Sequence, residues 1–159
     1  MIQPGSGSTL APRSPAAPPA DIIVRLAKAA AQAFAGTPIV LAYAYGSRVW
    51  GTPHAASDLD VGYYLAPGGT ARRLRGIVEL RLADRLSEVM GYEVDLRGLA
   101  DAPLGLRGRV LEEGAHVYCS DEVARVTIER DLLGRYHDYK PELEALRALR
   151  FAALAAKEA

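Results

Sequence analysis

The sequence has 159 residues, half of them hydrophobic, with 19 basic residues, 19 acidic residues and a single cysteine, Cys119. This length fits one compact domain, and the zero net charge argues against a strongly basic nucleic-acid-binding protein. A lone cysteine excludes an internal disulfide and a cysteine-rich zinc site. Neither a membrane-spanning apolar run nor a secretory signal is visible, so we expect a cytoplasmic protein with no membrane partner and no direct nucleic-acid partner.

Residues 1–20 differ in composition from the rest of the chain. They hold five prolines among glycine, serine and alanine: Pro4, Pro12, Pro15, Pro18 and Pro19. Such a segment cannot bury enough apolar surface to offset the entropy of ordering it, so a disordered tail is predicted. Residues 21–159 are expected to form a single domain.

Helix and strand patterns alternate from Asp21 onward. Asp21 is a candidate N-cap for a helix over residues 21–35, and a continuous apolar run predicts a buried strand over 39–45. Gly46-Ser47 then interrupts the strand and leads into a short turn or helix at 48–50. Further periodicity predicts a strand at 58–65, a helix at 72–90, a strand at 92–96, a helix at 104–113 and a strand at 115–119.

The C-terminal segment has a helical pattern with one interruption. Ser120 is the expected N-cap, and the helix runs towards Lys140. Pro141 is expected to kink or break it, after which helix resumes to about Ala156. The whole pattern predicts an α/β fold of the α+β kind. Its sheet would be small and mixed, with about four strands flanked by helices and with a C-terminal helix or kinked helix pair.

Two aspartates at the start of the second strand carry the clearest chemical signal. Asp58 and Asp60 are two residues apart, so both side chains leave the same face of the strand. Paired carboxylates without cysteine or a close histidine pair favour Mg²⁺ over zinc, and Mg²⁺ also bridges substrate phosphates. The preceding turn at Gly46 and Ser47 lets the backbone approach an anion closely, and the Ser47 hydroxyl adds a donor.

A third carboxylate is needed to complete a two-metal site or to accept a proton, and Asp95 is the best candidate. It lies in the strand predicted over 92–96, which could pair beside the strand of the other two aspartates. Its apolar neighbours point to the opposite face, so an aspartate interrupts a buried element here. A surface charge at a strand end is the alternative for Asp95, and Glu93, which points the other way, is a weaker candidate.

The pattern of Gly-Ser, ten residues and then Asp-x-Asp resembles the nucleotidyltransferase superfamily typified by DNA polymerase β. More closely, the chain is similar to the minimal bacterial nucleotidyltransferases of the MntA type, which are encoded as antitoxins beside HEPN toxins. The resemblance covers nearly the whole chain after the tail, including the strand that carries Asp95, and is looser towards the C-terminus.

This resemblance implies a mechanism and a partner. Gly46 and Ser47 would hold the β- and γ-phosphates of ATP, and Asp58 and Asp60 would ligate two Mg²⁺ ions. Asp95 would ligate the catalytic ion and help deprotonate the attacking hydroxyl. In the family that hydroxyl belongs to a tyrosine of the HEPN RNase toxin, and the attached AMP silences the toxin.

Other functions stay open on the sequence alone. An enzyme of this fold could act on a small molecule such as an aminoglycoside, although such enzymes usually carry a larger C-terminal domain. A non-catalytic antitoxin could act by occlusion, although all three carboxylates are present. Arg130, His137 and Tyr139 have the spacing of the HEPN toxins themselves, but HEPN domains are all-helical and this chain has strong strand signals.

Five side chains near the motifs have competing structural and functional interpretations. Arg48 could meet a phosphate or lie in solvent, and Ser57 is expected to cap the turn before the paired aspartates. Trp50 could stack on a base, but packing under its loop is favoured. His54 is expected to be exposed, and His116 is expected to be a structural histidine in a buried strand.

The zero net charge also conceals clusters of like charge. The three aspartates would form an acidic cluster that attracts polyphosphate once Mg²⁺ is bound. Arg72, Arg73 and Arg75 are expected to form a solvated helix face, which could also steer an acidic or nucleotide partner.

Overall fold

The computed structural model describes residues 20–50 and 57–158. The predicted tail, apart from Ala20, and the predicted exposure of His54 lie outside these residues. The elements in chain order are α1 (Ala20–Phe34), β1 (Ile39–Tyr45), α2 (Ser47–Trp50), β2 (Leu59–Leu65), α3 (Gly76–Met90), β3 (Val94–Gly98), α4 (Leu104–Glu113), β4 (Ala115–Cys119) and α5 (Glu122–Lys157). The bounds predicted for β1, α4 and β4 are confirmed to the residue.

The strands form a mixed sheet with the order β3-β2-β1-β4. β1 pairs antiparallel with both β2 and β4, whereas β2 and β3 run parallel. A parallel pair cannot be closed by a hairpin and needs a crossover connection, which α3 provides. The predicted four-stranded mixed sheet flanked by helices is therefore confirmed within the described residues.

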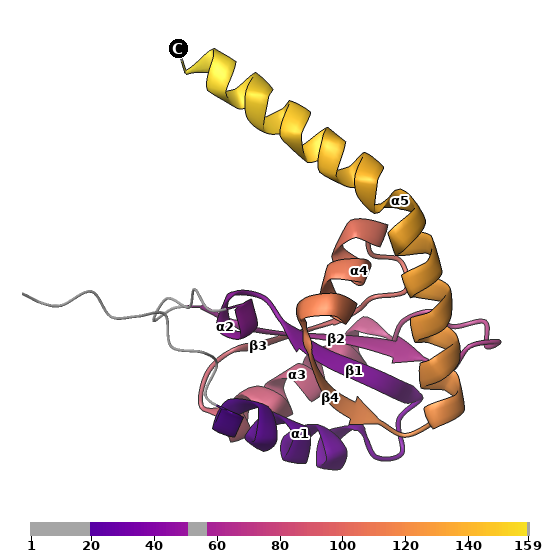
Figure 1. The fold of residues 1–159 in the computed structure, drawn as a ribbon. Helices are drawn as coiled ribbons and strands as arrows, with labels where there is room; N and C mark the ends of the chain where they lie inside the picture. The colour runs from indigo at the N-terminus through magenta and orange to yellow at the C-terminus, as the bar shows by residue number, and fades with distance from the viewer. Residues whose placement is uncertain (1–19, 51–56, 159) are drawn as a thin grey trace, which may run out of the picture.

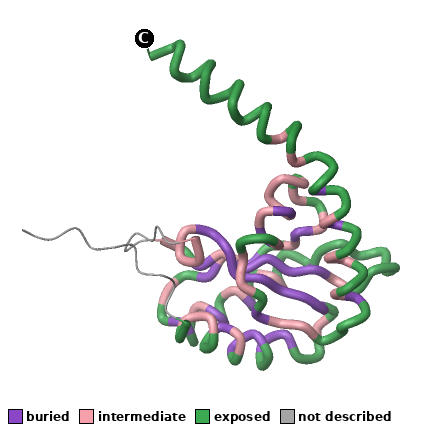
Figure 2. Tube along the Cα trace, viewed as in Figure 1, coloured by how far each residue is buried: buried purple, intermediate pink, exposed green. Residues whose placement is uncertain are grey.

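Helices cover both faces of the sheet (Figure 1). α1 and α3 pack on one face, where alternate strand residues such as Ala42 and Val61 join Leu26 and Leu86 in one core. α4 and α5 lie over the other face, where a second core includes Leu41. Figure 2 shows the buried residues concentrated in the central strands between these layers. A polar side chain on either face of these strands is therefore an exception to the packing.

α5 is a continuous helix of 36 residues that contains Pro141. The predicted break is wrong, but a kink is present, because Figure 1 shows α5 changing direction partway along. Proline removes one backbone hydrogen bond from the helix, and the carbonyl that loses it belongs to the exposed His137, which water can reach. No described helix, α5 included, is long and apolar enough to cross a membrane.

Asp121, and not the predicted Ser120, caps α5. The Asp121 carboxylate accepts a hydrogen bond of 3.0 Å from the backbone N–H of Ala124, whereas the Ser120 hydroxyl donates to the carbonyl of Ile39. An N-cap side chain contributes about 1 kcal/mol, so Asp121→Ala is expected to lower the free energy of unfolding by about that amount in urea denaturation. Asp121→Asn keeps a side-chain oxygen that can accept this hydrogen bond and is the matched control; an equal loss there would contradict the assignment.

α3 begins at Gly76, four residues later than the sequence pattern predicts. The backbone N–H of Leu74 donates a 2.9 Å hydrogen bond to the hydroxyl of Tyr63, which anchors this segment to β2. Arg75 is extended at the helix N-cap. The basic cluster that begins at Arg72 is therefore exposed in the connection before the helix and does not form a helix face.

β3 and β4 also differ from the expectations. β3 covers Val94–Gly98 and not 92–96, because its parallel pairing with β2 begins opposite Leu59. The prediction of a buried His116 is wrong: β4 is an edge strand, and His116 is exposed there with its ring 5.7 Å from that of Tyr43.

Candidate functional site

The three predicted carboxylates lie near the start of β2, on the sheet face covered by α4 and α5, with Asp60 and Asp95 on paired strands. Asp60 in β2 is paired with Asp95 in β3 on one side and with Tyr45 in β1 on the other. The strand neighbours of both aspartates enter the core against α1 and α3, so the aspartates point the opposite way. Asp58 lies just before β2, is exposed, and shares the side of Asp60 by alternation. The pairing of the Asp95 strand with the Asp60 strand is thus confirmed.

Gly46 ends β1 directly against Asp60. Its φ is +86°, in the region that favours glycine, and a Cβ at this position would lie 2.1 Å from Asp60 Oδ2. Its carbonyl accepts hydrogen bonds from the N–H groups of Val49 and Trp50, so α2 begins at once with Ser47. The turn and the carboxylate can therefore occupy this space only if residue 46 has no side chain.

The charges of the site disfavour full ionisation of its carboxylates. Burial raises the pKa of Asp60, the negative charges of Asp95 and Asp58 raise it further, and the Arg97 guanidinium partly offsets the rise. A cation bound nearby would stabilise the ionised carboxylates, because it offsets their mutual repulsion.

Arg97 supplies a positive charge that the sequence analysis did not single out. Its Nη2 lies 2.5 Å from Asp95 Oδ2, and about half of the guanidinium side chain and 40% of the carboxylate side chain are exposed. Arg97 stands two residues after Asp95 in β3, so strand alternation places both on one face. That spacing is the signal that could have identified it.

Tyr45 is a second neighbour that the sequence analysis missed. Its hydroxyl is buried and makes no hydrogen bond within the described part of the chain. Burial raises the pKa of Tyr45 to about 12, with the carboxylates of Asp60 and Asp95 adding to the rise and Arg97 opposing it. A neutral hydroxyl donor therefore lies next to the carboxylates at physiological pH.

The interpretations of Trp50 and Arg48 are now decided by their contacts. Trp50 packs 6.0 Å from the Tyr45 ring with the Arg109 guanidinium 3.8 Å above it, which favours the packing interpretation. Arg48 Nε donates a 2.6 Å hydrogen bond to the carbonyl of Ser57, so Arg48 links α2 to the start of β2. Arg48 is thus anchored to the fold through Nε and is not a free surface side chain.

The side chains of this site are of the kind that bind Mg²⁺. Across 20–50 and 57–158, no group of three or more His, Cys, Asp or Glu side chains is arranged so that it could hold a metal ion. Mg²⁺ does not need such a group, because proteins usually hold it through one or two carboxylates, water and substrate phosphates. The coupled carboxylates of Asp60 and Asp95 offer oxygen ligands and an unfavourable charge that the ion would relieve. The residues present therefore fit Mg²⁺.

A cavity of about 470 Å³ opens beside Asp95. Its walls come from β3, from the segment before α3 and from the residues that lead into α4, and they include Arg97, Arg73 and Asp101. An acceptor group could therefore approach Asp95 from this side without displacing Gly46 or Ser47.

Comparison with known proteins identifies one protein family and a group of solved structures that share one fold. Residues 28–123 match the family model described as polymerase beta, nucleotidyltransferase. The comparison with curated proteins gives no match.

Several solved structures have the same fold over nearly their whole length. A toxin-antitoxin crystal structure with AMP-PNP is 22% identical, with a TM-score of 0.58, and the alignment covers 81% of this chain and 98% of that chain. The toxin-antitoxin MntA-HepT is 18% identical, with a TM-score of 0.55 and coverage of 83% and 98%. A tri-AMPylated Shewanella oneidensis HEPN toxin in complex with MNT antitoxin gives 18% identity, a TM-score of 0.56 and coverage of 83% and 98%. At these identities the likeness shows the fold alone.

Proposed function

Because this chain belongs to the polymerase beta nucleotidyltransferase family, we propose that it is a Mg²⁺-dependent adenylyltransferase that modifies a tyrosine hydroxyl of a HEPN toxin. The observation that carries the proposal is the pairing of Asp60 with Asp95 beside a glycine turn that admits no side chain. The similar structures support the choice of donor and partner, since one holds AMP-PNP and another contains an AMPylated HEPN toxin.

Each residue of the site would have its own role in the proposed reaction. Gly46 and Ser47 would hold the β- and γ-phosphates of ATP, and Asp58, Asp60 and Asp95 would hold Mg²⁺. When bound, Mg²⁺ supplies charge neutralisation on the phosphates and lowers the pKa of the acceptor hydroxyl. Asp95, which faces the cavity, would accept the proton of that hydroxyl. The tyrosine oxygen bonds to the α-phosphorus of ATP, the bond from that phosphorus to the bridging oxygen breaks, and pyrophosphate leaves.

The open side of the site suits a protein acceptor. The described residues wall the cavity beside Asp95 from β3, the segment before α3 and the start of α4, and they leave it open on one side. A small acceptor would need further walls to be oriented, whereas a folded partner brings its own surface to the site. This favours a macromolecular acceptor over an aminoglycoside.

The direct test is transfer of label from ATP to a HEPN protein encoded beside this chain. With Mg²⁺ present, the label is expected on a tyrosine of the partner, and chelation of Mg²⁺ with EDTA should abolish the transfer. Asp58→Ala combined with Asp60→Ala should do the same. If the variant with alanine at Asp58, Asp60 and Asp95 still protects cells fully, the antitoxin acts by occlusion and the proposal is wrong.

Arg97 is expected to compete with Mg²⁺ for the carboxylate of Asp95. A half-exposed ion pair contributes up to about 1 kcal/mol, which corresponds to about fivefold in an equilibrium constant. Arg97→Gln should therefore lower the Mg²⁺ concentration that gives half-maximal transfer by up to about fivefold. Arg81→Gln removes the same charge from an exposed position on α3 and should leave this concentration unchanged. An increase in the Arg97 variant would contradict the competition.

A further inference from the structure

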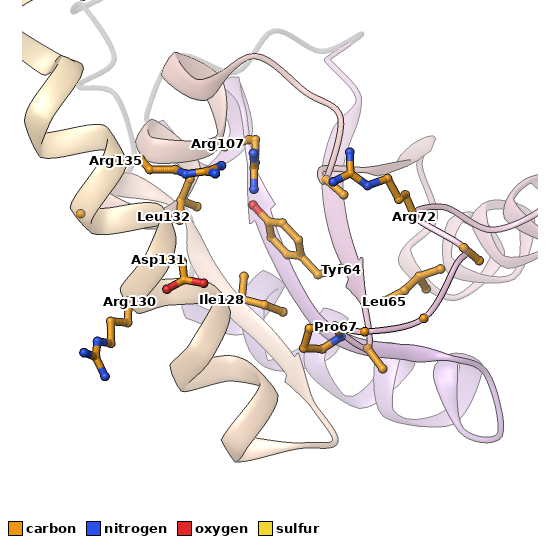
Figure 3. A pocket seen from close by; sticks show the side chains of 16 residues that line it. Tyr64, Leu65, Pro67, Arg72, Arg107, Ile128, Arg130, Asp131, Leu132 and Arg135 are labelled. Atoms are coloured by element: carbon orange, nitrogen blue, oxygen red, sulfur yellow. The ribbon is translucent and has the colours of Figure 1, made fainter.

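A second and larger cavity lies away from the three aspartates, between the segment after β2 and the first half of α5 (Figure 3). Its volume is about 750 Å³, within the range of small-molecule sites. The end of β2, α4 and α5 contribute to its walls, and the apolar part of the lining includes Leu65, Ile128 and Leu132.

This cavity is separated from the catalytic carboxylates by packed side chains. Tyr64, which lines it, follows Asp60 by four residues in β2, a separation of about 13 Å along a strand. Between them, the fully buried Leu99 packs on Gly62, where an added Cβ would lie 2.4 Å from Leu99 Cδ1. A ligand in the cavity would therefore not touch the aspartates.

The charged groups around the cavity are mainly positive. Among the described residues, four arginines line it, Arg72, Arg107, Arg130 and Arg135, together with one carboxylate, Asp131. In Figure 3, Arg135 points towards Arg107, and Arg130 points away from the cavity. Arg72 pairs with Asp101 at 2.7 Å, but no ion pair within 20–50 and 57–158 reaches Arg107 or Arg135. Two guanidinium groups at the cavity therefore have no anionic partner there.

Two buried polar atoms at the same place have no well-formed hydrogen bond, although the Arg107 guanidinium interacts electrostatically with the Tyr64 hydroxyl. No hydrogen bond of ordinary geometry within the described residues reaches the hydroxyl of Tyr64, a residue only 4% exposed, or Nε of Arg107. Figure 3 shows the Tyr64 hydroxyl and the Arg107 side chain pointing towards one another. Buried polar groups are ordinarily satisfied by protein, water or a ligand. An oxygen-rich ligand in the cavity would provide the missing acceptors.

We propose that this cavity binds a multivalent phosphate, such as pyrophosphate or a nucleoside diphosphate, at a site that does not include the three aspartates. Guanidinium groups pair bidentately with phosphate oxygens. A multivalent phosphate neutralises Arg107 and Arg135 together, whereas a single carboxylate neutralises one. The apolar wall beside them offers a surface for the nucleoside of a nucleotide ligand.

Calorimetric titration of the full-length protein with pyrophosphate and with ADP, in EDTA, tests the proposal. EDTA removes any affinity that depends on metal at the aspartates, and the Asp58→Asn, Asp60→Asn double variant should bind with the affinity of the unmodified chain. Arg135→Glu should weaken binding at least tenfold, because an exposed α5 position loses a charge-assisted hydrogen bond and gains repulsion. Asp131→Asn should tighten binding severalfold.

Arg147→Glu makes the same charge change as Arg135→Glu at an exposed position of α5 outside the cavity, and binding should stay within twofold. Equal losses in the two variants would show diffuse attraction and overturn the site. So would an absence of binding by the unmodified chain, or preferential binding of a hexaglutamate peptide. Tighter binding of ADP than of pyrophosphate would assign the ligand as a nucleotide, and equal binding would assign it as the phosphate alone. No step of the test requires AMP transfer, so its outcome is independent of the proposed function.

Discussion

Gly46→Ala is expected to lower the rate of AMP transfer by about 100-fold or more. The φ of +86° strains an alanine by about 1–2 kcal/mol, and its methyl group would meet Asp60 Oδ2 at 2.1 Å. The carboxylate or the turn must move to admit it. A displacement of about 1 Å in a catalytic constellation costs on the order of 100-fold in rate. The measurement is the initial rate of label transfer from ATP at saturating Mg²⁺.

Gly36→Ala separates backbone strain from the clash. Gly36 also has a positive φ, +75°, but nothing lies within 4 Å of a Cβ added there. This variant should lose a similar amount of stability from strain and keep the transfer rate of the unmodified chain. If both glycine variants lose the same activity, general destabilisation explains the loss, and the contact with Asp60 does not.

Asp60→Asn is expected to have opposite effects on activity and on stability. Loss of a carboxylate that would hold the metal should lower the transfer rate by about 100–1,000-fold. In the absence of metal, however, the variant should be more stable than the unmodified chain at neutral pH. Burial and the charge of Asp95 disfavour the ionised Asp60 in the folded state, and asparagine carries no charge.

The pH dependence of this effect follows from the direction of the pKa shift. A carboxyl whose pKa is raised by folding contributes stability below its unfolded pKa, and this contribution is lost as pH rises through the folded value. The stability advantage of Asp60→Asn should therefore grow from acidic to neutral pH in urea denaturation with EDTA. Asp58→Asn should lose activity with little change in stability, because Asp58 is exposed. If Asp60→Asn instead lowers the free energy of unfolding at neutral pH, the ionised Asp60 does not destabilise the folded state.

Much of the fold could be predicted because local patterns and packing agree. β1 is buried along its whole length, and its continuous apolar run identifies it with the observed bounds. Asp58 and Asp60 could be chosen because residues two apart in a strand share one face, and Asp95 because a carboxylate interrupts an otherwise apolar strand. Gly46 could be placed at a turn because Gly-Ser interrupts the apolar run of β1. Its contact with Asp60 depends on the tertiary structure and could not be predicted from the local sequence.

The remaining features depend on contacts between distant residues. The start of α3 is set by the hydrogen bond from Leu74 to Tyr63, which no local pattern contains. The exposure of His116 follows from the place of β4 at the sheet edge. The pairing of Arg97 with Asp95 was within reach of strand alternation, but the cavity with unpaired arginines was not. Its walls come from three separate parts of the chain.

Because β3 lies at the edge of the sheet, the part of the proposed site that carries Asp95 should unfold more easily than the part that carries Asp60. Asp60 stands in a strand paired on both sides, whereas Asp95 stands in a strand of five residues that, in the part of the chain the structure describes, has a neighbouring strand on one side only. Edge strands open at a lower free-energy cost than the centre of a sheet. Release of β3 alone would carry Asp95 away from Asp60 while β1, β2 and the glycine turn stay in place. The protein could therefore lose its third carboxylate, and with it the proposed chemistry, without losing its fold.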